Sequence, residues 1–177
     1  MEHNIPTSSR IILNAEEIQQ KIRRIAYEIF ERNFGEERLV LAGIDDRGYL
    51  LAEKLATELV QISPFKFETS TLSLLKIQLE KFTQRQCEVR LEDAPENLEG
   101  SSVIVVDDVL NTGRTLAYSL RPFLEQPLKK LEIAVLVNRS HIKFPVVASY
   151  TGYELATTLE EHIEVVLEEN AEAVYLH

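Results

Sequence analysis

Short apolar runs that alternate with amphipathic segments constrain this chain more than any other feature of its sequence. Leu39–Ile44, Val103–Val106 and Leu131–Val137 are continuous apolar runs of strand length, and such runs are typical of parallel strands covered on both faces. Between them, apolar residues recur at three- and four-residue intervals and indicate helices. The alternation predicts an α/β domain with a mainly parallel sheet flanked by helices, whose ligands bind at the carboxyl ends of the strands.

The helices are predicted from caps and apolar spacing. Asn14 and Glu17 have the spacing of a capping box, so a helix is expected from Asn14 to about Gly35. Helical spacing resumes at Leu51, which makes Ile44–Gly48 a predicted strand-to-helix loop. A further helix is expected over Thr115–Leu124.

Further strands are predicted in the second and last thirds of the chain. They are expected within Phe65–Leu74 and at Val146–Tyr150, Ile163–Leu167 and Ala173–Leu176. Leu75–Arg90 fits either a loop or an extended hairpin, and Asp93–Gly100 is an acidic, turn-rich connection. Because no linker or repeat divides the chain, one domain is predicted over residues 1–177.

Composition excludes several classes of protein. A chain of 177 residues buries roughly 70% of its unfolded surface, enough for a core without disulfide or metal support. Cys87 is the only cysteine, which rules out an intramolecular disulfide and a cysteine-based zinc or iron–sulfur site within one chain. The formal net charge of -10 disfavours general binding to nucleic acids or anionic membranes.

The apolar runs are also too short to cross a membrane. They fall far below the roughly 20 residues that span a bilayer. The first residues, Met1–Asn4, lack a basic start followed by an apolar block, so no secretory signal is indicated and the cytoplasm is the expected location.

The segment Val106–Thr115 carries the most chemical information. Asp107 and Asp108 come directly after a predicted buried strand, and a small, hydroxyl-rich loop opens the next helix. Backbone amides and threonine hydroxyls in such a loop can cradle a phosphate, and adjacent carboxylates can accept hydrogen bonds from a vicinal diol. The segment therefore favours a sugar phosphate. An acidic strand end followed by a capped helix remains the alternative for the two aspartates.

This segment resembles the phosphoribosyl-pyrophosphate motif of the type I phosphoribosyltransferases. Its pattern is four apolar residues, two acids and then Thr-Gly-Arg-Thr. Within that family, other segments resemble the subgroup of bifunctional pyrimidine operon regulators and uracil phosphoribosyltransferases. Those segments are Arg24–Ile29, Gly43–Gly48 and Ala134–His141, with Pro145, Tyr150 and Gly152. The resemblance implies the type I fold, a central mainly parallel sheet with flanking helices and a small hood region.

The resemblance also implies roles for individual residues. Asp107 and Asp108 would hold the ribose hydroxyls, and the 5-phosphate would lie in a loop formed by Asn111, Thr112, Gly113, Arg114 and Thr115. The pyrophosphate would face a second loop, formed by Asp45, Asp46, Arg47 and Gly48, with Arg47 as its charge partner. A pyrimidine would lie against the main chain of Tyr150, Thr151 and Gly152, with Arg139 nearby. Mg²⁺ would be held mainly through the ligand, with no dedicated protein metal site.

Two loops depart from the subgroup. Asp45 and Asp46 stand where the subgroup has a basic or neutral residue and a Thr, and Ser73–Lys76 replaces its Tyr-Arg-Asp-Asp. Lys76, Lys81 and Arg85 are possible substitutes for the lost cation, and the sequence does not select among them. A phosphoribosyltransferase that converts a nucleobase, with uracil first, is therefore one hypothesis. A regulator that senses phosphoribosyl pyrophosphate or a nucleotide without turnover is the other.

Positions that bind RNA in the subgroup are largely uncharged here. Arg24 and His141 remain, whereas four basic or polar positions are occupied by Tyr27, Ile142, Val147 and Tyr153. Because RNA affinity depends on the number of phosphates neutralised, RNA is not expected as a partner. The expected partners are the small-molecule substrates and a second copy of the chain, in a homodimer or higher homo-oligomer.

Overall fold

Six strands form the central sheet, in the order β4-β3-β2-β5-β6-β7. The computed structural model describes residues 9–67, 69, 71–80, 88–156, 161–168 and 170–177. The parallel strands are β2 (Leu39–Ile44), β3 (Leu72–Leu79), β5 (Ser102–Leu110), β6 (Lys130–Asn138) and β7 (Tyr150–Glu154). The edge strand β4 (Val89–Glu92) pairs antiparallel to β3. The predicted mainly parallel sheet is confirmed.

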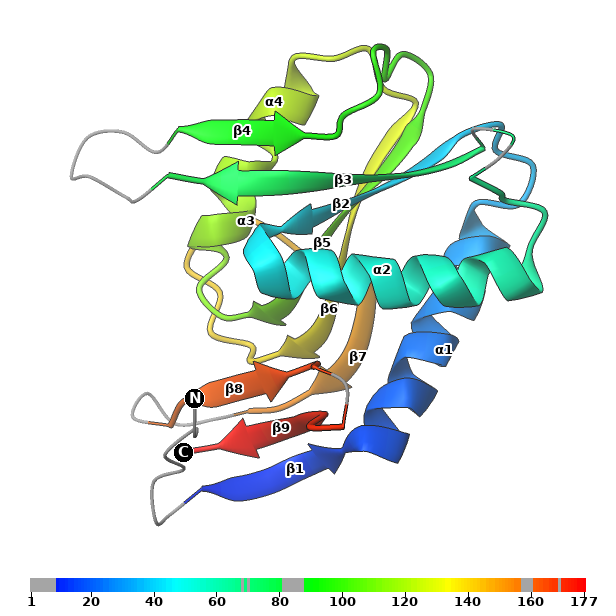
Figure 1. The fold of residues 1–177 in the computed structure, drawn as a ribbon. Coiled ribbons are helices and arrows are strands. Elements are labelled where there is room, and N and C mark those ends of the chain that lie inside the picture. The colour runs from blue at the N-terminus through cyan, green and yellow to red at the C-terminus, as the bar shows by residue number, and fades with distance from the viewer. Residues whose placement is uncertain (1–8, 68, 70, 81–87, 157–160, 169) are drawn as a thin grey trace.

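Helices cover both faces of this sheet (Figure 1). The long helices α1 (Ala15–Arg32) and α2 (Asp45–Ile62) pack on one face, where their apolar side chains share a core with Ile104 and Val106 of β5. The short helices α3 (Arg114–Ser119) and α4 (Arg121–Leu124) pack on the other face, against Val103 and Val105. Alternate residues of β5 therefore enter two separate cores, which explains its unbroken apolar sequence.

The capping box predicted for the first helix is present. Glu17 donates its backbone N–H to the Asn14 side chain at 3.0 Å, and the Glu17 carboxylate accepts from the Asn14 amide at 2.9 Å. The helix ends at Arg32, three residues before Gly35, because Asn33 caps it with a backbone bond to the Ile29 carbonyl.

A second, smaller sheet joins segments from both ends of the chain. Its antiparallel order is β1-β9-β8, formed by β1 (Arg10–Asn14), β9 (Ala173–Leu176) and β8 (Ile163–Val166). Leu13, Ile163, Val165 and Val174 share the core of α1 and α2. Figure 1 shows this three-stranded sheet as a separate layer beside the start of α2, and it is called the hood below.

The connections leave β2 and β5 in opposite directions. From β2 the chain passes through α2 to β3 on one side, and from β5 it passes through α3 and α4 to β6 on the other. Neighbouring parallel strands whose connections diverge leave a crevice at their carboxyl ends, where ligands of such sheets bind. The two polar segments that the sequence singled out, at Asp45 and at Asp107, both lie at this crevice.

Two predicted boundaries are wrong around α2. The expected loop over Ile44–Gly48 is absent, because α2 begins at Asp45, directly after β2. Asp45 makes the turn in a single residue with a left-handed backbone, at φ 48°. The strand expected within Phe65–Leu74 begins only at Leu72, since Thr71 closes a turn by bonding through its side chain and backbone to Lys66.

Three further boundaries differ after β4. The helix expected over Thr115–Leu124 is divided at Leu120, and Pro122 stands at the start of the second piece, where a missing N–H is tolerated. The strand expected over Val146–Tyr150 begins at Tyr150, because Val146 turns to pack beside Gly113. β5 continues to Leu110, so Asp107 and Asp108 lie within the strand rather than after it.

Of the two alternatives predicted for Leu75–Arg90, a loop or an extended hairpin, the hairpin is confirmed in part. β3 and β4 pair antiparallel, with Lys76 opposite Glu92 and Leu79 opposite Val89. Lys81, Arg85 and Cys87 lie outside the described residues. Among the described residues, no helix is long and apolar enough to cross a membrane. The single domain over residues 1–177 stays a prediction.

Candidate active site

Two adjacent carboxylates lie at the centre of the crevice. Asp107 is buried, with 8% of its surface exposed, and its Oδ1 accepts the Asp108 amide at 3.0 Å. Asp108 accepts the Val109 amide at 2.9 Å, and its side chain is 14% exposed. Burial first, and then the negative charge of Asp108, raise the pKa of Asp107 well above its usual range. Such a pair favours a ligand that brings hydrogen-bond donors or positive charge.

The first turn of α2 closes the crevice from the β2 side. A Cβ added at Gly48 would lie 2.5 Å from the Val106 carbonyl oxygen, so only glycine lets the helix approach β5 this closely. Arg47 is thereby brought over the acidic pair, with its guanidinium 3.8 Å from the Asp108 carboxylate. The Arg47 side chain is 60% exposed, which leaves it free to bind an anion in the cleft.

The two acids of this turn are directed toward β3. Asp45 accepts the Leu79 amide at 3.1 Å, and Asp46 lies 2.5 Å from the ammonium of Lys76. The hydrogen bond from Lys76 lowers the pKa of Asp46. Both carboxylates therefore have partners on the β3–β4 hairpin, which reduces their repulsion toward an anion beside Arg47.

The loop after β5 has the form of an anion cradle. Gly113 has a left-handed backbone, at φ 80°, and a Cβ there would lie 2.4 Å from Val146. The Lys143 and Phe144 amides both donate to the Thr112 carbonyl, at 2.9 and 3.1 Å, and hold the loop from the β6–β7 connection. The Arg114 amide at the start of α3 donates to the Thr112 hydroxyl at 3.3 Å. The amides of Thr115 and Leu116, in the same first turn, have no carbonyl partner within the helix and are available to a phosphate.

These parts line two adjoining hollows. A cleft of about 440 Å³ is lined by Ile44, Asp45, Asp46, Arg47, Asp107, Asp108, Val109 and Thr115. A pocket of about 120 Å³ is lined by Asp107 and by residues 109–116. Asp107, Val109 and Thr115 belong to both. The arrangement can hold a phosphate in the small pocket, a diol at the acidic pair and a second anionic group beside Arg47.

A third hollow was not foreseen from the sequence. It measures about 100 Å³ and lies between the first turns of α2 and the hood, where Arg47 and Leu50 face Val165 and Leu167. Its hood wall comes from the last part of the chain, whose sequence carries a strand pattern but no motif. Only the tertiary fold brings that wall beside Arg47.

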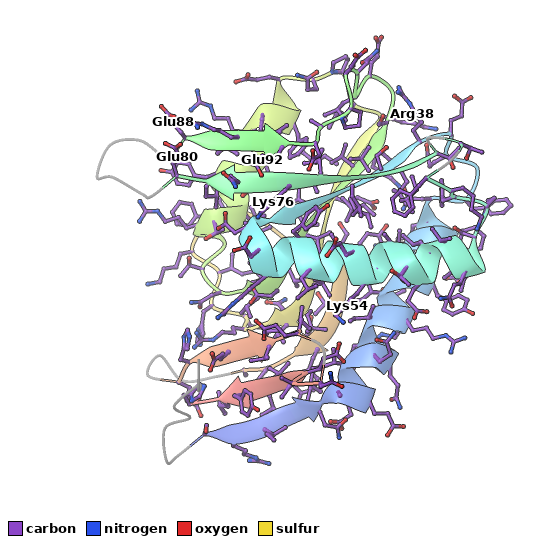
Figure 2. The ribbon with its side chains drawn as sticks, viewed as in Figure 1. Arg38, Lys54, Lys76, Glu80, Glu88 and Glu92 are labelled. Carbon is purple, nitrogen blue, oxygen red and sulfur yellow. The ribbon has the colours of Figure 1, made fainter. Side chains whose placement is uncertain are left out.

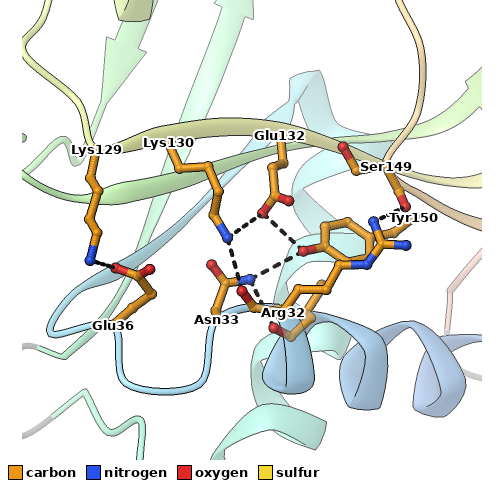
Figure 3. A network of polar contacts seen from close by, with 9 residues as sticks. Arg32, Asn33, Glu36, Lys129, Lys130, Glu132, Ser149 and Tyr150 are labelled. Carbon is orange, nitrogen blue, oxygen red and sulfur yellow. Dashed lines mark hydrogen bonds and ion pairs between the residues drawn. The ribbon is translucent and has the colours of Figure 1, made fainter.

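Tyr150 does not reach the cleft. Its phenol donates to Glu132 at 2.9 Å and accepts from Asn33 at 3.2 Å, so the ring extends back toward the amino ends of the strands (Figure 3). Burial raises its pKa. The predicted contact between a pyrimidine and the main chain at Tyr150 does not involve this phenol and stays a prediction.

The neighbours of Tyr150 are also engaged elsewhere. The carbonyls of Thr151 and Gly152 accept from the guanidinium of Arg24, at 2.9 and 2.6 Å. Arg139 is buried and donates to the Glu161 carbonyl at 2.5 Å, which ties the end of β6 to the segment that leads into the hood. Base contacts from Thr151, Gly152 and Arg139 stay predictions.

A magnesium ion held by the ligand would face Asp107 and Asp108. Among the described residues, no group of three or more His, Cys, Asp or Glu side chains is placed to hold a metal. The Asp107–Asp108 pair offers carboxylate oxygens beside the space for a diol, and Mg²⁺ characteristically combines one or two carboxylates with phosphate oxygens and water. The residues present are compatible with that mode of binding.

Comparison with protein families and curated sequences agrees with this geometry. Residues 8–172 match the family model described as a phosphoribosyl transferase domain. A "Bifunctional protein PyrR" from Staphylococcus saprophyticus is 38% identical over 165 residues, covering 92% of this chain and 94% of the relative. A protein of the same name from Deinococcus radiodurans is 37% identical over 161 residues, covering 89% of this chain and 87% of the relative.

Solved structures share the fold at lower sequence identity. A hypoxanthine-guanine phosphoribosyltransferase from Bacillus anthracis has a TM-score of 0.64 and 23% identity, covering 83% of this chain and 84% of the other. A hypoxanthine phosphoribosyltransferase from Trypanosoma cruzi has a TM-score of 0.69 and 22% identity, covering 82% and 80%. At this identity the likeness concerns the fold.

Proposed function

This chain belongs to the type I phosphoribosyltransferase family, and from that premise we propose that it transfers ribose 5-phosphate from phosphoribosyl pyrophosphate to a nucleobase. Uracil is the proposed base, and the products are uridine monophosphate and pyrophosphate. The observation that carries the proposal is the continuity of the anion cradle, the acidic pair and Arg47 along one crevice. Phosphoribosyl pyrophosphate has a 5-phosphate, a ribose diol and a pyrophosphate in the same order.

Each part of the crevice has a task in this reaction. The loop Asn111–Thr115 would bind the 5-phosphate, and Asp107 and Asp108 would accept hydrogen bonds from the ribose hydroxyls. Arg47 would neutralise charge that develops on the pyrophosphate as it leaves the anomeric carbon. The base nitrogen attacks that carbon from the opposite side. The protein contributes positioning and charge stabilisation rather than a nucleophile of its own.

Mg²⁺ is proposed to arrive with the substrate. Asp107 and Asp108 are the carboxylates that would face it, and the bound ion would supply further positive charge to the pyrophosphate. The close packing of Gly48 on Val106 fixes the distance between Arg47 and this pair. The cation and the carboxylates thus have a set spacing before any ligand enters.

The preference for uracil rests on the resemblance to the pyrimidine subgroup. Two curated relatives with the name "Bifunctional protein PyrR" cover nine-tenths of the chain at 37–38% identity. The hypoxanthine-specific names belong to structures at 22–23% identity, so they do not favour a purine for this chain. A homodimer remains a proposal from the same resemblance.

A sensor without turnover is the second candidate. It is favoured by the acids Asp45 and Asp46, which lie beside the space proposed for pyrophosphate. A sensor would need the cradle and the diol acceptors but no stabilisation of a leaving group. Binding without product formation would distinguish it from the enzyme.

Ligand-induced stabilisation tests binding, which both candidates require. Phosphoribosyl pyrophosphate with Mg²⁺ at about a hundred times its Kd should stabilise the fold by about 2.7 kcal/mol and raise Tm. Asp107→Asn and Asp108→Asn should reduce the ligand-induced shift, because they weaken the diol acceptors. Lys54→Gln is the matched control, because Lys54 pairs with Glu172 and does not line the cleft. An unchanged Tm of the native protein at millimolar ligand would contradict the proposal.

A further inference from the structure

Lys76 projects from β3 toward the first turn of α2. In the register of the sheet it lies beside Gly43, one residue before the end of β2. Leu72 and Leu74, which share its side of β3, pack in the core formed with α2. Figure 2 shows Lys76 between β3 and the start of α2. Its ammonium lies 2.5 Å from Asp46, a residue that lines the cleft with Arg47 and Asp107.

The two members of this ion pair differ in exposure. The Lys76 side chain is 22% exposed, whereas that of Asp46 is 93% exposed. Lys76 is thus held by the strand beneath it, and Asp46 is held mainly by Lys76. Exposed ion pairs contribute little to stability and are readily exchanged. A more highly charged anion in the cleft would compete with Asp46 for the ammonium.

Three acidic residues lie near Lys76. Glu92 lies opposite it on β4, and Asp45 and Asp46 begin α2. Asp45 also accepts the Leu79 amide, so it fixes the end of β3 against α2 and keeps Lys76 beside the cleft. The acids at the start of α2 therefore position a cation that comes from the next strand.

We propose that Lys76 is a second pyrophosphate ligand, held in place by Asp46 until the substrate arrives and then transferred from Asp46 to the pyrophosphate. The proposal rests on the proposed function, because it concerns the same cleft. It gives the cleft two cations, Arg47 from α2 and Lys76 from β3. No covalent bond changes, since one ion pair replaces another.

A purely structural ion pair makes a different prediction. If Lys76 and Asp46 only fasten β3 to α2, then removing either side chain breaks the same contact, and both variants should weaken ligand binding. If Asp46 competes with the ligand for Lys76, the two variants should act in opposite directions. Whether Asp46→Asn strengthens or weakens ligand binding therefore distinguishes a competing Asp46 from a purely structural ion pair.

Calorimetric titration with magnesium pyrophosphate and, separately, ribose 5-phosphate tests the proposal. Lys76→Gln should weaken pyrophosphate binding by about tenfold or more, because a charge-assisted contact is lost. Asp46→Asn should strengthen it, and the double variant should resemble Lys76→Gln. Ribose 5-phosphate, which depends on the cradle and the acidic pair, should bind all of them equally. Lys76→Arg should retain most of the affinity.

Lys54→Gln is the matched control. Lys54, labelled in Figure 2, makes an ion pair of the same length, 2.5 Å with Glu172, and is 21% exposed. Its partner Glu172 does not line the cleft, whereas Asp46, the partner of Lys76, does. Lys54→Gln should change neither the affinity for pyrophosphate nor the affinity for ribose 5-phosphate. Thermal unfolding of each variant checks that the fold is retained.

Two results would overturn the inference. Equal weakening by Lys76→Gln and Asp46→Asn would make the pair structural, and native affinity in Lys76→Gln would remove Lys76 from the site. In either case ribose 5-phosphate binding would leave the proposed function standing. If the native protein bound neither pyrophosphate nor ribose 5-phosphate, the proposed function would fail, and the role of Lys76 with it.

Discussion

Arg47 of α2 and Asp108 of β5 lie 3.8 Å apart, nitrogen to oxygen, across the crevice at the carboxyl ends of two neighbouring strands. Arg47 is largely exposed and Asp108 is mostly buried. A loosely held cation therefore lies beside a firmly held carboxylate. Arg47 can therefore stabilise a departing anion, while Asp108 can accept hydrogen bonds from ribose hydroxyls.

Arg47→Ala should impair catalysis more than substrate anchoring. Losing one fixed donor to the departing pyrophosphate should raise the barrier by about 2.7–4 kcal/mol, which lowers kcat by roughly 10²–10³-fold. Ribose 5-phosphate affinity should stay close to native, because the cradle at Asn111–Thr115 is unchanged. Steady-state kinetics and calorimetry provide the two readouts, with Arg47→Lys as the charge-preserving comparison. A parallel loss of ribose 5-phosphate affinity would contradict the separate roles.

Asp107→Asn should stabilise the free protein at neutral pH while it weakens substrate binding. The pKa of Asp107 is raised in the folded state, chiefly by burial, so the fold favours the protonated carboxyl. The native protein therefore loses stability as pH rises from the unfolded-state pKa through the raised folded-state pKa. Asparagine does not ionise and escapes this loss.

Urea unfolding at several pH values measures the effect of Asp107→Asn. The stability advantage of the variant should be present at pH 7 and should shrink as pH falls toward the ordinary aspartate range. Two results would contradict a raised pKa of Asp107 in the folded protein. One is a gain in stability of Asp107→Asn that does not change with pH, and the other is a variant less stable than the native protein at pH 7.

Gly48→Ala should disturb the site through the packing of α2. The new Cβ would lie 2.5 Å from the Val106 carbonyl oxygen, a backbone atom that cannot move away cheaply. We expect a stability loss of about 1–3 kcal/mol, with loss of activity because Arg47 is displaced from Asp108. Gly100→Ala is the control: its φ of 69° is strained for alanine but no atom lies within 4 Å of the added Cβ. It should cost about 1–2 kcal/mol and leave turnover intact.

RNA binding should be weak and sensitive to salt. Tyr27, Ile142 and Val147 are 43%, 43% and 77% exposed, so three positions that lack the subgroup's basic or polar side chain are on the surface. Arg24 is engaged with the carbonyls of Thr151 and Gly152. Fluorescence anisotropy with a pyrimidine-operon leader hairpin at physiological salt should give no affinity beyond the non-specific range of about 10⁻⁴–10⁻⁶ M. A tight complex would restore a regulatory role.

Local sequence signals predicted the elements whose pattern of burial is regular. β2 was expected with its observed bounds because all six of its residues are buried, and α1 was expected because its cap and its apolar stripe agree. The loop Asn111–Thr115 could be predicted as a phosphate-binding loop because its glycine and hydroxyls are contiguous in the chain. These features depend on neighbours in sequence, which the sequence displays directly.

The remaining features depend on contacts between distant segments. Nothing in the residues around Tyr150 indicates that its phenol bonds to Asn33 and Glu132 and so turns from the cleft. The link between Lys76 and Asp46 joins residues 30 apart in the chain, and the sequence alone did not choose Lys76 over other basic residues. The hood wall beside Arg47 arises only when the last strands pair with the first.

A coupled assay of pyrophosphate release from phosphoribosyl pyrophosphate, with Mg²⁺ and a panel of free bases, tests whether this chain is a phosphoribosyltransferase. We expect release that requires a base, is greatest with uracil, yields an equal amount of uridine monophosphate and falls sharply in Asp107→Asn. Release with a purine base instead would retain the reaction class and overturn the choice of uracil. No release above the Asp107→Asn background with any base, from protein that binds the substrate, would contradict the assignment as an enzyme.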